Sequence, residues 1–240
     1  MLQVITRMNK FSFRISLAMI VLSYTILSCS GNKKTGPALD VRIIGLDKGT
    51  VYLKAFENDT LLKIIDSAKV KGQKQIRFDL HGVPPQLLLL EVKERPGEYL
   101  MFFSDDTLVQ ITTELDRFGY AKRITGGTNV RLWRQYKDML MQYNSRKLDL
   151  VKAMLTARQK RDTIALDSVQ RKLQSIERRR KLFSYNFALS KPFAPVRAYV
   201  AYTEFRDNPA ALDSIYHSWK THTGIYDTLI RHLLDSINRP

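Results

Sequence analysis

The spacing of hydrophobic residues along the chain changes at about residue 126. Before this point, short runs rich in Val, Ile, Leu, Tyr and Phe alternate with turn residues about every 8–12 residues, a pattern typical of a β-sandwich. Between two of the runs, Pro96-Gly97 suits a type II turn, because glycine tolerates the positive φ of the second corner. The pattern predicts an N-terminal antiparallel β-sandwich over residues 39–127. Its strand-like runs are residues 41–46, 50–56, 61–70, 75–80, 86–92, 99–103, 107–113 and 120–125.

From residue 128 onward the apolar residues recur at helical spacing. Thr128 or Asn129 can cap the first helix, and Asp162 can cap the second. Only about four residues separate these two helices, which predicts a long antiparallel helical hairpin. The stripe of the first helix comprises Val130, Trp133, Leu140, Val151 and Leu155. The heptad seam of the second comprises Val169, Leu173, Ile176, Arg180, Phe183 and Phe187.

The remaining chain predicts three shorter helices. Pro195 opens the first, which extends to residue 206, and Asn208 caps the second. Gly224 separates the second helix from the last. Residues 128–240 therefore form an all-helical domain, and the fold class is α+β. Within it, Arg180 occupies an apolar slot, so its side chain either reaches solvent at an end of the seam or pairs with an acid of the facing helix.

The first residues have the pattern of an export signal. All three charges before Cys29 are positive, and residues 15–27 carry none. This uncharged run of about 13 residues is too short to span a membrane but suits the apolar region of a signal peptide. Ile26, Leu27, Ser28 and Cys29 then resemble a bacterial lipobox, which is cut between Ser28 and Cys29. We therefore expect a signal peptide over 1–28 and a lipidated tether over 29–38. The alternatives are an ordinary secretory signal with an incidental cysteine, and a true start at Met8.

The lipobox implies that the Cys29 sulfur carries a diacylglycerol and that its amino group carries a fatty acyl chain such as palmitate. Two or more chains give stable attachment, whereas one alone is marginal. Cys29 is the only cysteine, so no thiol is left for a disulfide, redox couple or zinc–thiolate site. Five small or basic residues without an acid follow Cys29. By resemblance to sorting in Bacteroidetes, this predicts an outer-membrane lipoprotein that faces the periplasm.

Residues able to carry chemistry are sparse. Four histidines show no metal-ligand spacing, so no metal and no cofactor is predicted. Gly126-Gly127-Thr128 lacks the lysine of a phosphate loop, which favours a plain strand-to-helix turn. Asp105 and Asp106 lie in a loop between two strand-like runs, where acids are common. The aromatic residues of the helices are interpreted as packing residues.

Positive charge is concentrated in one helical segment. The net charge of +16 falls to +13 when the three signal cations are removed, and residues 152–181 hold ten Lys or Arg against three acids. Such a face is usually solvated, but it also suits attraction to anionic lipid headgroups or lipopolysaccharide. An exported protein would rarely meet nucleic acid, so nucleic acid is not a predicted partner. The candidate patch comprises Arg171, Lys172, Arg178, Arg179, Arg180 and Lys181.

The order of these segments resembles a known bacterial family. After the lipobox come VYLKAF, IIDSAKVKG, IRFDL, YLMFFSDDTLVQIT and RITGGTNV, and then FALSKPFAPVRAYVAYTEF and LDSIYHSWKTHTGIYDTLIRHLLDSI. This resembles the N-terminal domain of unknown function of Bacteroidetes thioredoxin-like lipoproteins, of the thiol–disulfide oxidoreductase type, with the helical region that follows it. The chain departs from that pattern by extra residues before Phe78. In the family a thioredoxin domain with a Trp-Cys-x-x-Cys motif normally follows, and this sequence has no such motif.

These observations favour a non-catalytic envelope lipoprotein that acts as a binding module. One such role would be as an accessory to redox lipoproteins. Its predicted partners are the membrane, through the lipid, and an envelope protein. The alternative is a basic protein that binds an anionic surface. A hydrolytic enzyme with a site assembled from scattered residues is the least favoured class. The sequence identifies no ligand and no oligomeric state.

Overall fold

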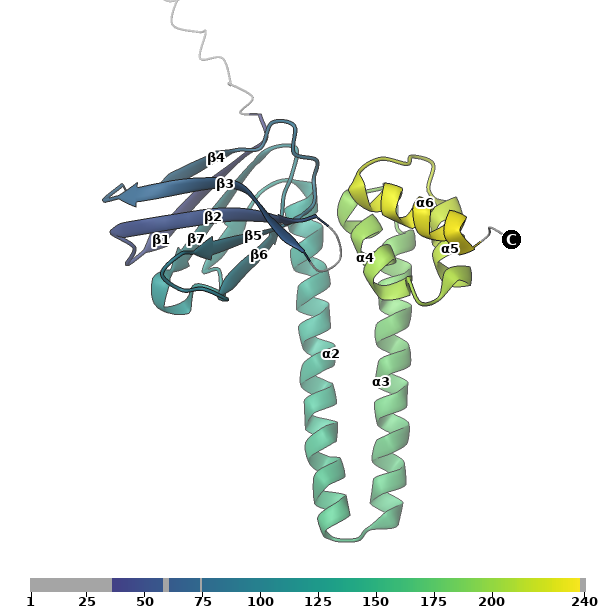
Figure 1. The fold of residues 1–240 in the computed structure, drawn as a ribbon. Helices are drawn as coiled ribbons and strands as arrows, with labels where there is room; N and C mark the ends of the chain where they lie inside the picture. Colours follow the sequence, from purple (N-terminus) through teal and green to yellow (C-terminus); the bar gives the residue numbers. More distant parts are fainter. Residues whose placement is uncertain (1–35, 58–60, 74, 238–240) are drawn as a thin grey trace, which may run out of the picture. The chain divides into compact units, whose positions relative to one another are not determined.

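The β part of the computed structural model consists of two four-stranded sheets (Figure 1). The structure describes residues 36–57, 61–73 and 75–237. The signal peptide, Ser28, Cys29 and most of the tether lie outside these residues. One sheet has the order β4-β1-β7-β8 and the other has the order β3-β2-β5-β6. The strands are β1 (Ala38–Ile44), β2 (Lys48–Phe56), β3 (Leu62–Lys71), β4 (Ile76–Asp79), β5 (Leu87–Val92), β6 (Tyr99–Phe103), β7 (Leu108–Glu114) and β8 (Arg123–Thr125).

Alternating side chains of both sheets form one hydrophobic core. Phe78 comes from the first sheet and Phe102 from the second, and both are fully buried within it. β5 is buried along its whole length because Leu88 and Leu90 face this core while Leu87 faces the helices. The sequence of a strand that is covered on both faces is a nearly continuous apolar run, as in LLLLEV.

The predicted strands agree closely with those observed, but two features differ. β1 pairs with β7 in parallel, so the pairing is not antiparallel throughout as predicted. The last predicted run shrinks to Arg123–Thr125 because residues 115–121 turn back on themselves, and the Thr113 hydroxyl donates to the carbonyls of Phe118 and Tyr120. The predicted turn at Pro96-Gly97 is confirmed, since Gly97 has a φ of 85° and Glu98 N–H bonds to the Arg95 carbonyl.

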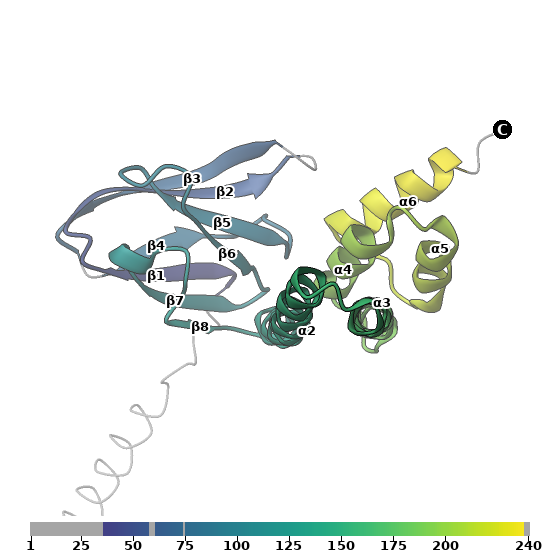
Figure 2. The ribbon, with the colours of Figure 1, turned by 90° about the horizontal axis from the view of Figure 1, so that it is seen from below.

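Five helices follow the strands. They are α2 (Thr128–Gln159), α3 (Thr163–Leu189), α4 (Pro195–Phe205), α5 (Pro209–Ser218) and α6 (Ile225–Ile237). α2 and α3 lie side by side in both views (Figures 1 and 2), and Tyr136 of α2 stacks on Phe183 of α3. The predicted caps at the second and fourth helix are confirmed: the Asp162 carboxylate accepts from Ala165 N–H and the Asn208 amide accepts from Ala211 N–H.

A second core joins the helices to the sheet that contains β5 and β6. Leu87 and Phe103 from this sheet belong to it, together with buried residues of all five helices. The Tyr226 hydroxyl of α6 accepts a hydrogen bond of 3.1 Å from the Leu87 N–H. The two predicted domains therefore share a hydrophobic interface at one face of a sheet.

Glu91 is a buried carboxylate on β5 that pairs with Lys54 of β2. Its Oε1 also accepts a hydrogen bond of 3.1 Å from the Gly97 N–H. Burial alone would raise the pKa of Glu91, but the hydrogen bonds and the charge of Lys54 hold that pKa below its ordinary value of 4.5. A carboxyl with a lowered folded pKa stabilises the protein above its unfolded pKa, and this stabilisation is lost as the pH falls through the folded value.

We expect Glu91→Gln to weaken the loss of stability below pH 4.5, because it removes a group that must be protonated in acid. The measurement is urea unfolding at neutral pH and again in acid. Glu98→Gln is the matched control, since Glu98 is exposed and lies 3.5 Å from Arg95. Equal acid slopes in wild type and Glu91→Gln would contradict the assignment.

Candidate functional site

A groove of about 510 Å³ lies where the end strands of the two sheets meet α2. We call it the edge groove. It is lined by residues 100–103 of β6, by residues 119–125, which include β8, and by the side of α2 from Val130 to Met141. Of the four β6 residues that line the groove, Met101 is 45% exposed, whereas Leu100, Phe102 and Phe103 are buried.

Hydrogen bonds in the sheet show which backbone groups of β6 point away from β5. Ser104 N–H donates to the Gln86 carbonyl at 2.8 Å, just beyond the end of the β5–β6 pairing. Hydrogen-bonded and non-bonded residues alternate along an antiparallel pair, so Leu100 and Phe102 also bond to β5. The N–H and carbonyl groups of Met101 and Phe103 consequently point away from β5, but only Met101 is exposed, because Phe103 is fully buried. Among the described residues, β6 pairs with β5 alone.

Apolar and charged side chains together line the edge groove. Met101 and Met141 are 45% and 59% exposed. The charged lining residues are four cations, Lys122, Arg123, Arg134 and Lys137, and one acid, Asp138. Lys122 pairs with Glu114 at 3.0 Å.

Trp133 forms the aromatic part of the groove wall. Lys137 Nζ lies 5.9 Å from the centre of its ring, within reach of a cation–π contact. Tyr199 meets the same ring edge-on at 5.5 Å. The indole N–H of Trp133 is buried and has no hydrogen-bond partner among the described residues. Its ring is thus held by aromatic packing and by no hydrogen bond of its own.

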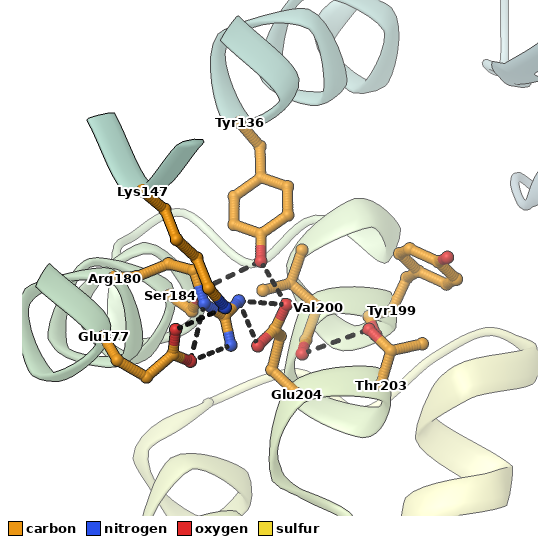
Figure 3. Close-up of polar contacts among 9 residues, drawn as sticks. All are labelled: Tyr136, Lys147, Glu177, Arg180, Ser184, Tyr199, Val200, Thr203 and Glu204. Atoms are coloured by element: carbon orange, nitrogen blue, oxygen red, sulfur yellow. Dashed lines mark hydrogen bonds and ion pairs between the residues drawn. The ribbon is translucent and has the colours of Figure 1, made fainter. Parts of the chain in front are cut away.

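A polar network joins three helices away from the edge groove (Figure 3). Glu204 of α4 accepts bonds of 2.9 and 2.8 Å from Arg180 Nη1 of α3, and it accepts a bond of 3.1 Å from the Tyr136 hydroxyl of α2. Tyr136 also bonds to the Ser184 hydroxyl at 2.9 Å. Glu177 accepts from Arg180 Nε at 3.0 Å. We call these five residues the helix network.

The helix network explains the charged residue in the apolar seam. The partner of Arg180 is Glu204 of α4 together with Glu177 of its own helix, and not an acid of the facing helix α2. Burial by itself would lower the pKa of Arg180, but bonds to Glu204 and Glu177 raise it. Burial and the nearby Glu204 carboxylate raise the pKa of Tyr136, so its hydroxyl stays protonated and donates. Because its groups bond to one another, the network has a structural role, which is to hold α2, α3 and α4 together.

A second buried carboxylate, from the loop between β6 and β7, contacts the N-terminus of α2. Asp105 is 7% exposed, and its Oδ2 accepts from the backbone N–H groups of Asn129 at 2.8 Å and Val130 at 3.3 Å. The interpretation of Gly126-Gly127-Thr128 as a strand-to-helix turn is confirmed, because these residues connect β8 to α2. The predicted cap at Thr128 or Asn129 is wrong, since the capping carboxylate comes from Asp105 before β7.

The predicted basic patch is divided by the structure. Arg171, Lys172, Arg178, Arg179 and Lys181 are exposed on α3, and Arg171 pairs with Asp167 at 2.8 Å. The Arg180 side chain is only 20% exposed and belongs to the helix network, so it is not available as part of the patch. The exposed cations that remain are separated in sequence by one heptad, from Arg171 to Arg178 and from Lys172 to Arg179.

Two of the histidines each lie beside an acid. His222 contacts the buried Asp227 at 2.9 Å, while His217 lies beside Asp213 at 3.2 Å. Within residues 36–237, apart from 58–60 and 74, no three His, Cys, Asp or Glu side chains gather as metal ligands would. The same part of the chain contains no helix long and apolar enough to span a bilayer. Ser28 and Cys29, the predicted cleavage and lipid-attachment residues, are outside it.

Comparisons with protein-family models, curated proteins and solved structures find no match to this chain. The resemblance to thioredoxin-like lipoproteins therefore stays a prediction.

The sequence analysis did not predict the edge groove, although the spacing of residues on α2 indicates one side of it. Trp133, Lys137 and Met141 step by four residues on α2, so the face that packs on the sheets continues into exposed positions. The partner strand β6 was predicted, but its place at the edge of a sheet depends on pairings that local spacing does not encode. Glu204 was missed for the same reason.

Proposed function

We propose that this chain is a lipid-anchored protein of the bacterial cell envelope that binds a partner protein and catalyses no reaction. The lipobox at Cys29, the absence of another cysteine and the resemblance to thioredoxin-like lipoproteins support the location and the accessory role. We further classify the β part as a β-sandwich and α2 with α3 as an antiparallel helical hairpin, as that resemblance implies. The shared core of the two sheets and the α2–α3 contacts support this classification.

The edge groove is the observation that carries the binding role. Its volume of about 510 Å³ falls in the range of ligand-binding clefts, and a lining of apolar side chains with a few charged groups is typical of such sites. The helix network holds α3 and α4 against the helix that forms one wall. A rigid wall lowers the entropic cost of binding.

Two variants test this proposal in cells. Cys29→Ser is expected to leave the body folded and to release it from membranes, because the acyl chains are its attachment. Photo-crosslinking then tests the groove, with p-benzoylphenylalanine in place of Met141. Leu148 is the matched control, because it is 55% exposed on the same helix but does not line the groove.

A discrete adduct from position 141 and none from position 148 is the expected result. A Cys29→Ser protein that stays with membranes and resists carbonate extraction would contradict the anchor. No adduct from position 141 would contradict the groove as the binding site.

The five exposed cations of α3 favour a second candidate function, which is attraction to an anionic surface such as lipid headgroups or lipopolysaccharide. This candidate predicts that liposome binding weakens steeply with added salt. Arg178→Gln with Arg179→Gln should reduce binding to phosphatidylglycerol vesicles, and both residues are exposed outside the helix network. Arg180 is left intact because its replacement would remove the bonds that join α3 to α4. Unchanged vesicle binding by the double variant would remove this candidate.

A further inference from the structure

We propose that the turn joining α2 to α3 contacts the surface of a bilayer that contains anionic phospholipids. Figure 1 shows this turn at one end of the paired helices. We call residues 155–164 the hairpin tip. The edge groove ends at Met141 and the cations of α3 begin at Arg171, so the tip is a surface separate from both. A contact there would be additional to the two binding roles proposed above.

Three cations lie within four positions of one another in the hairpin tip. Arg158, Lys160 and Arg161 are all exposed, and within the part of the chain that the structure describes none of them forms an ion pair. The one acid of the tip, Asp162, accepts a hydrogen bond from the Ala165 N–H as the cap of α3. Each Lys or Arg close to an anionic lipid surface adds to the attraction. The charge of the tip therefore suits phospholipid headgroups.

The backbone holds one of these cations in a strained conformation. Arg161 has a φ of 54°, in the left-handed region. The N–H groups of Arg161 and Asp162 bond to the carbonyls of Arg158 and Ala157, which is a helix end where glycine usually occupies the left-handed position. A residue with a Cβ is strained there, and such strain is found most often at functional positions. An arginine at this position favours a role for its charge.

Ile164 gives the hairpin tip an apolar contact. Its side chain is 83% exposed, and Leu155, one turn before the end of α2, is 52% exposed. Side chains of a helix are tilted toward its N-terminus, so Ile164, in the first turn of α3, is tilted toward the turn between the helices. Apolar side chains beside basic ones are typical of segments that lie in the membrane interface. The tip thus combines charge attraction with a side chain that can enter the acyl region.

Two other occupants fit the hairpin tip less well. A turn between two helices is convex, so a partner protein would need a cavity of matching shape, whereas lipid headgroups rearrange around it. A second copy of this chain would bring the same cations together, and like charges oppose association.

The experiment uses the full chain with Cys29→Ser and Thr163→Cys, so that the only thiol carries the environment-sensitive dye nitrobenzoxadiazole. Thr163 is exposed beside Ile164. Vesicles of phosphatidylcholine with phosphatidylglycerol should raise the emission of the dye and shift it to the blue, because the dye enters an apolar environment. Vesicles of phosphatidylcholine alone should not, and added salt should weaken the response.

A dye at Leu182→Cys in place of Thr163→Cys is the matched control. Leu182 is 58% exposed on the same helix but lies outside the hairpin tip, among the exposed cations of α3. We expect no response from this position. Any attachment through the N-terminus of the chain would affect both labelled proteins alike, so the difference between them reports on the tip.

Substitutions in the protein labelled at position 163 separate the charged from the apolar contribution. Lys160→Gln with Arg161→Gln should raise the lipid concentration for half of the response about tenfold or more. Ile164→Ser should raise it about fivefold or more, and Leu182→Ser should not. Urea unfolding of each variant checks the fold.

Arg161→Gly distinguishes a lipid-binding role of this arginine from a structural one. Glycine relieves the left-handed strain, so the urea midpoint of unfolding should rise. The lipid concentration for half of the response should nevertheless increase about threefold or more, because a cation is lost. An arginine with only a structural role would give a glycine variant with unchanged vesicle binding.

The proposal is overturned if the dye at position 163 does not respond to anionic vesicles or responds equally to phosphatidylcholine alone. A response at position 182 without one at position 163 would also overturn it, and would assign the membrane contact to the exposed cations of α3. Unchanged vesicle binding in Arg161→Gly and in Lys160→Gln with Arg161→Gln would overturn it as well. The edge groove has its own test, which is the adduct from position 141.

Discussion

Asp105→Ala is expected to lower the free energy of unfolding by about 2–4 kcal/mol. The carboxylate is buried and bonds to the first backbone N–H groups of α2, which have no partners within the helix. Removing it leaves two buried donors unpaired and takes a negative charge from the positive end of the helix dipole. Equilibrium unfolding in urea measures the loss.

Asp106→Ala is the matched control, because Asp106 is adjacent and exposed, and its loss should change stability by less than about 0.5 kcal/mol. Asp105→Asn keeps one acceptor oxygen without the charge and should fall between the two. Similar unfolding curves for Asp105→Ala and Asp106→Ala would show that the cap contributes little.

Gly127 gives an independent check of the same contact. A Cβ on Gly127 would lie 2.7 Å from Asp105 Oδ1, closer than such atoms approach, so Gly127→Ala must displace the carboxylate. Gly127→Ala should lower the free energy of unfolding by less in an Asp105→Ala background than in wild type, because the clash with the carboxylate is absent there. A double-mutant cycle measures this coupling. Additive costs would mean that the two residues act separately.

Glu204→Ala is expected to lower the free energy of unfolding by about 2–3 kcal/mol, because it leaves the partly buried guanidinium of Arg180 without its main partner. The Arg180 and Glu204 side chains are 20% and 19% exposed, so water compensates only in part. The same substitution removes the acceptor of the Tyr136 hydroxyl. Urea unfolding followed by tryptophan fluorescence measures the change.

The loss of stability in Glu204→Ala should come from the unpaired charge of Arg180. A double variant separates this effect from the effect of lost packing. Arg180→Met combined with Glu204→Leu removes both charges and should recover most of the stability, since apolar residues of similar volume can replace an ion pair. Arg179→Ala, an exposed neighbour of Arg180, should have an effect below about 0.5 kcal/mol. A double variant less stable than Glu204→Ala would show that the pair itself contributes net stability.

The sequence alone determined the features that depend on neighbouring residues. The change from a two-residue repeat to a helical repeat near residue 126 predicted the strands and the five helices, because each repeat places the apolar side chains of one element on one side. The caps at Asp162 and Asn208 and the turn at Pro96-Gly97 were also predicted. Each of these depends on bonds that span three residues or fewer, so the local sequence contains the necessary information.

Only the tertiary structure decided which distant segments meet. The parallel pairing of β1 with β7, the capping of α2 by Asp105 and the bonding of Arg180 to Glu204 join residues at least 24 positions apart. The edge groove likewise depends on β6 being the last strand of its sheet. Such contacts form because each element must bury its apolar face against another, and many partners satisfy one local pattern equally well. The packing of the whole chain determines which of these partners is selected.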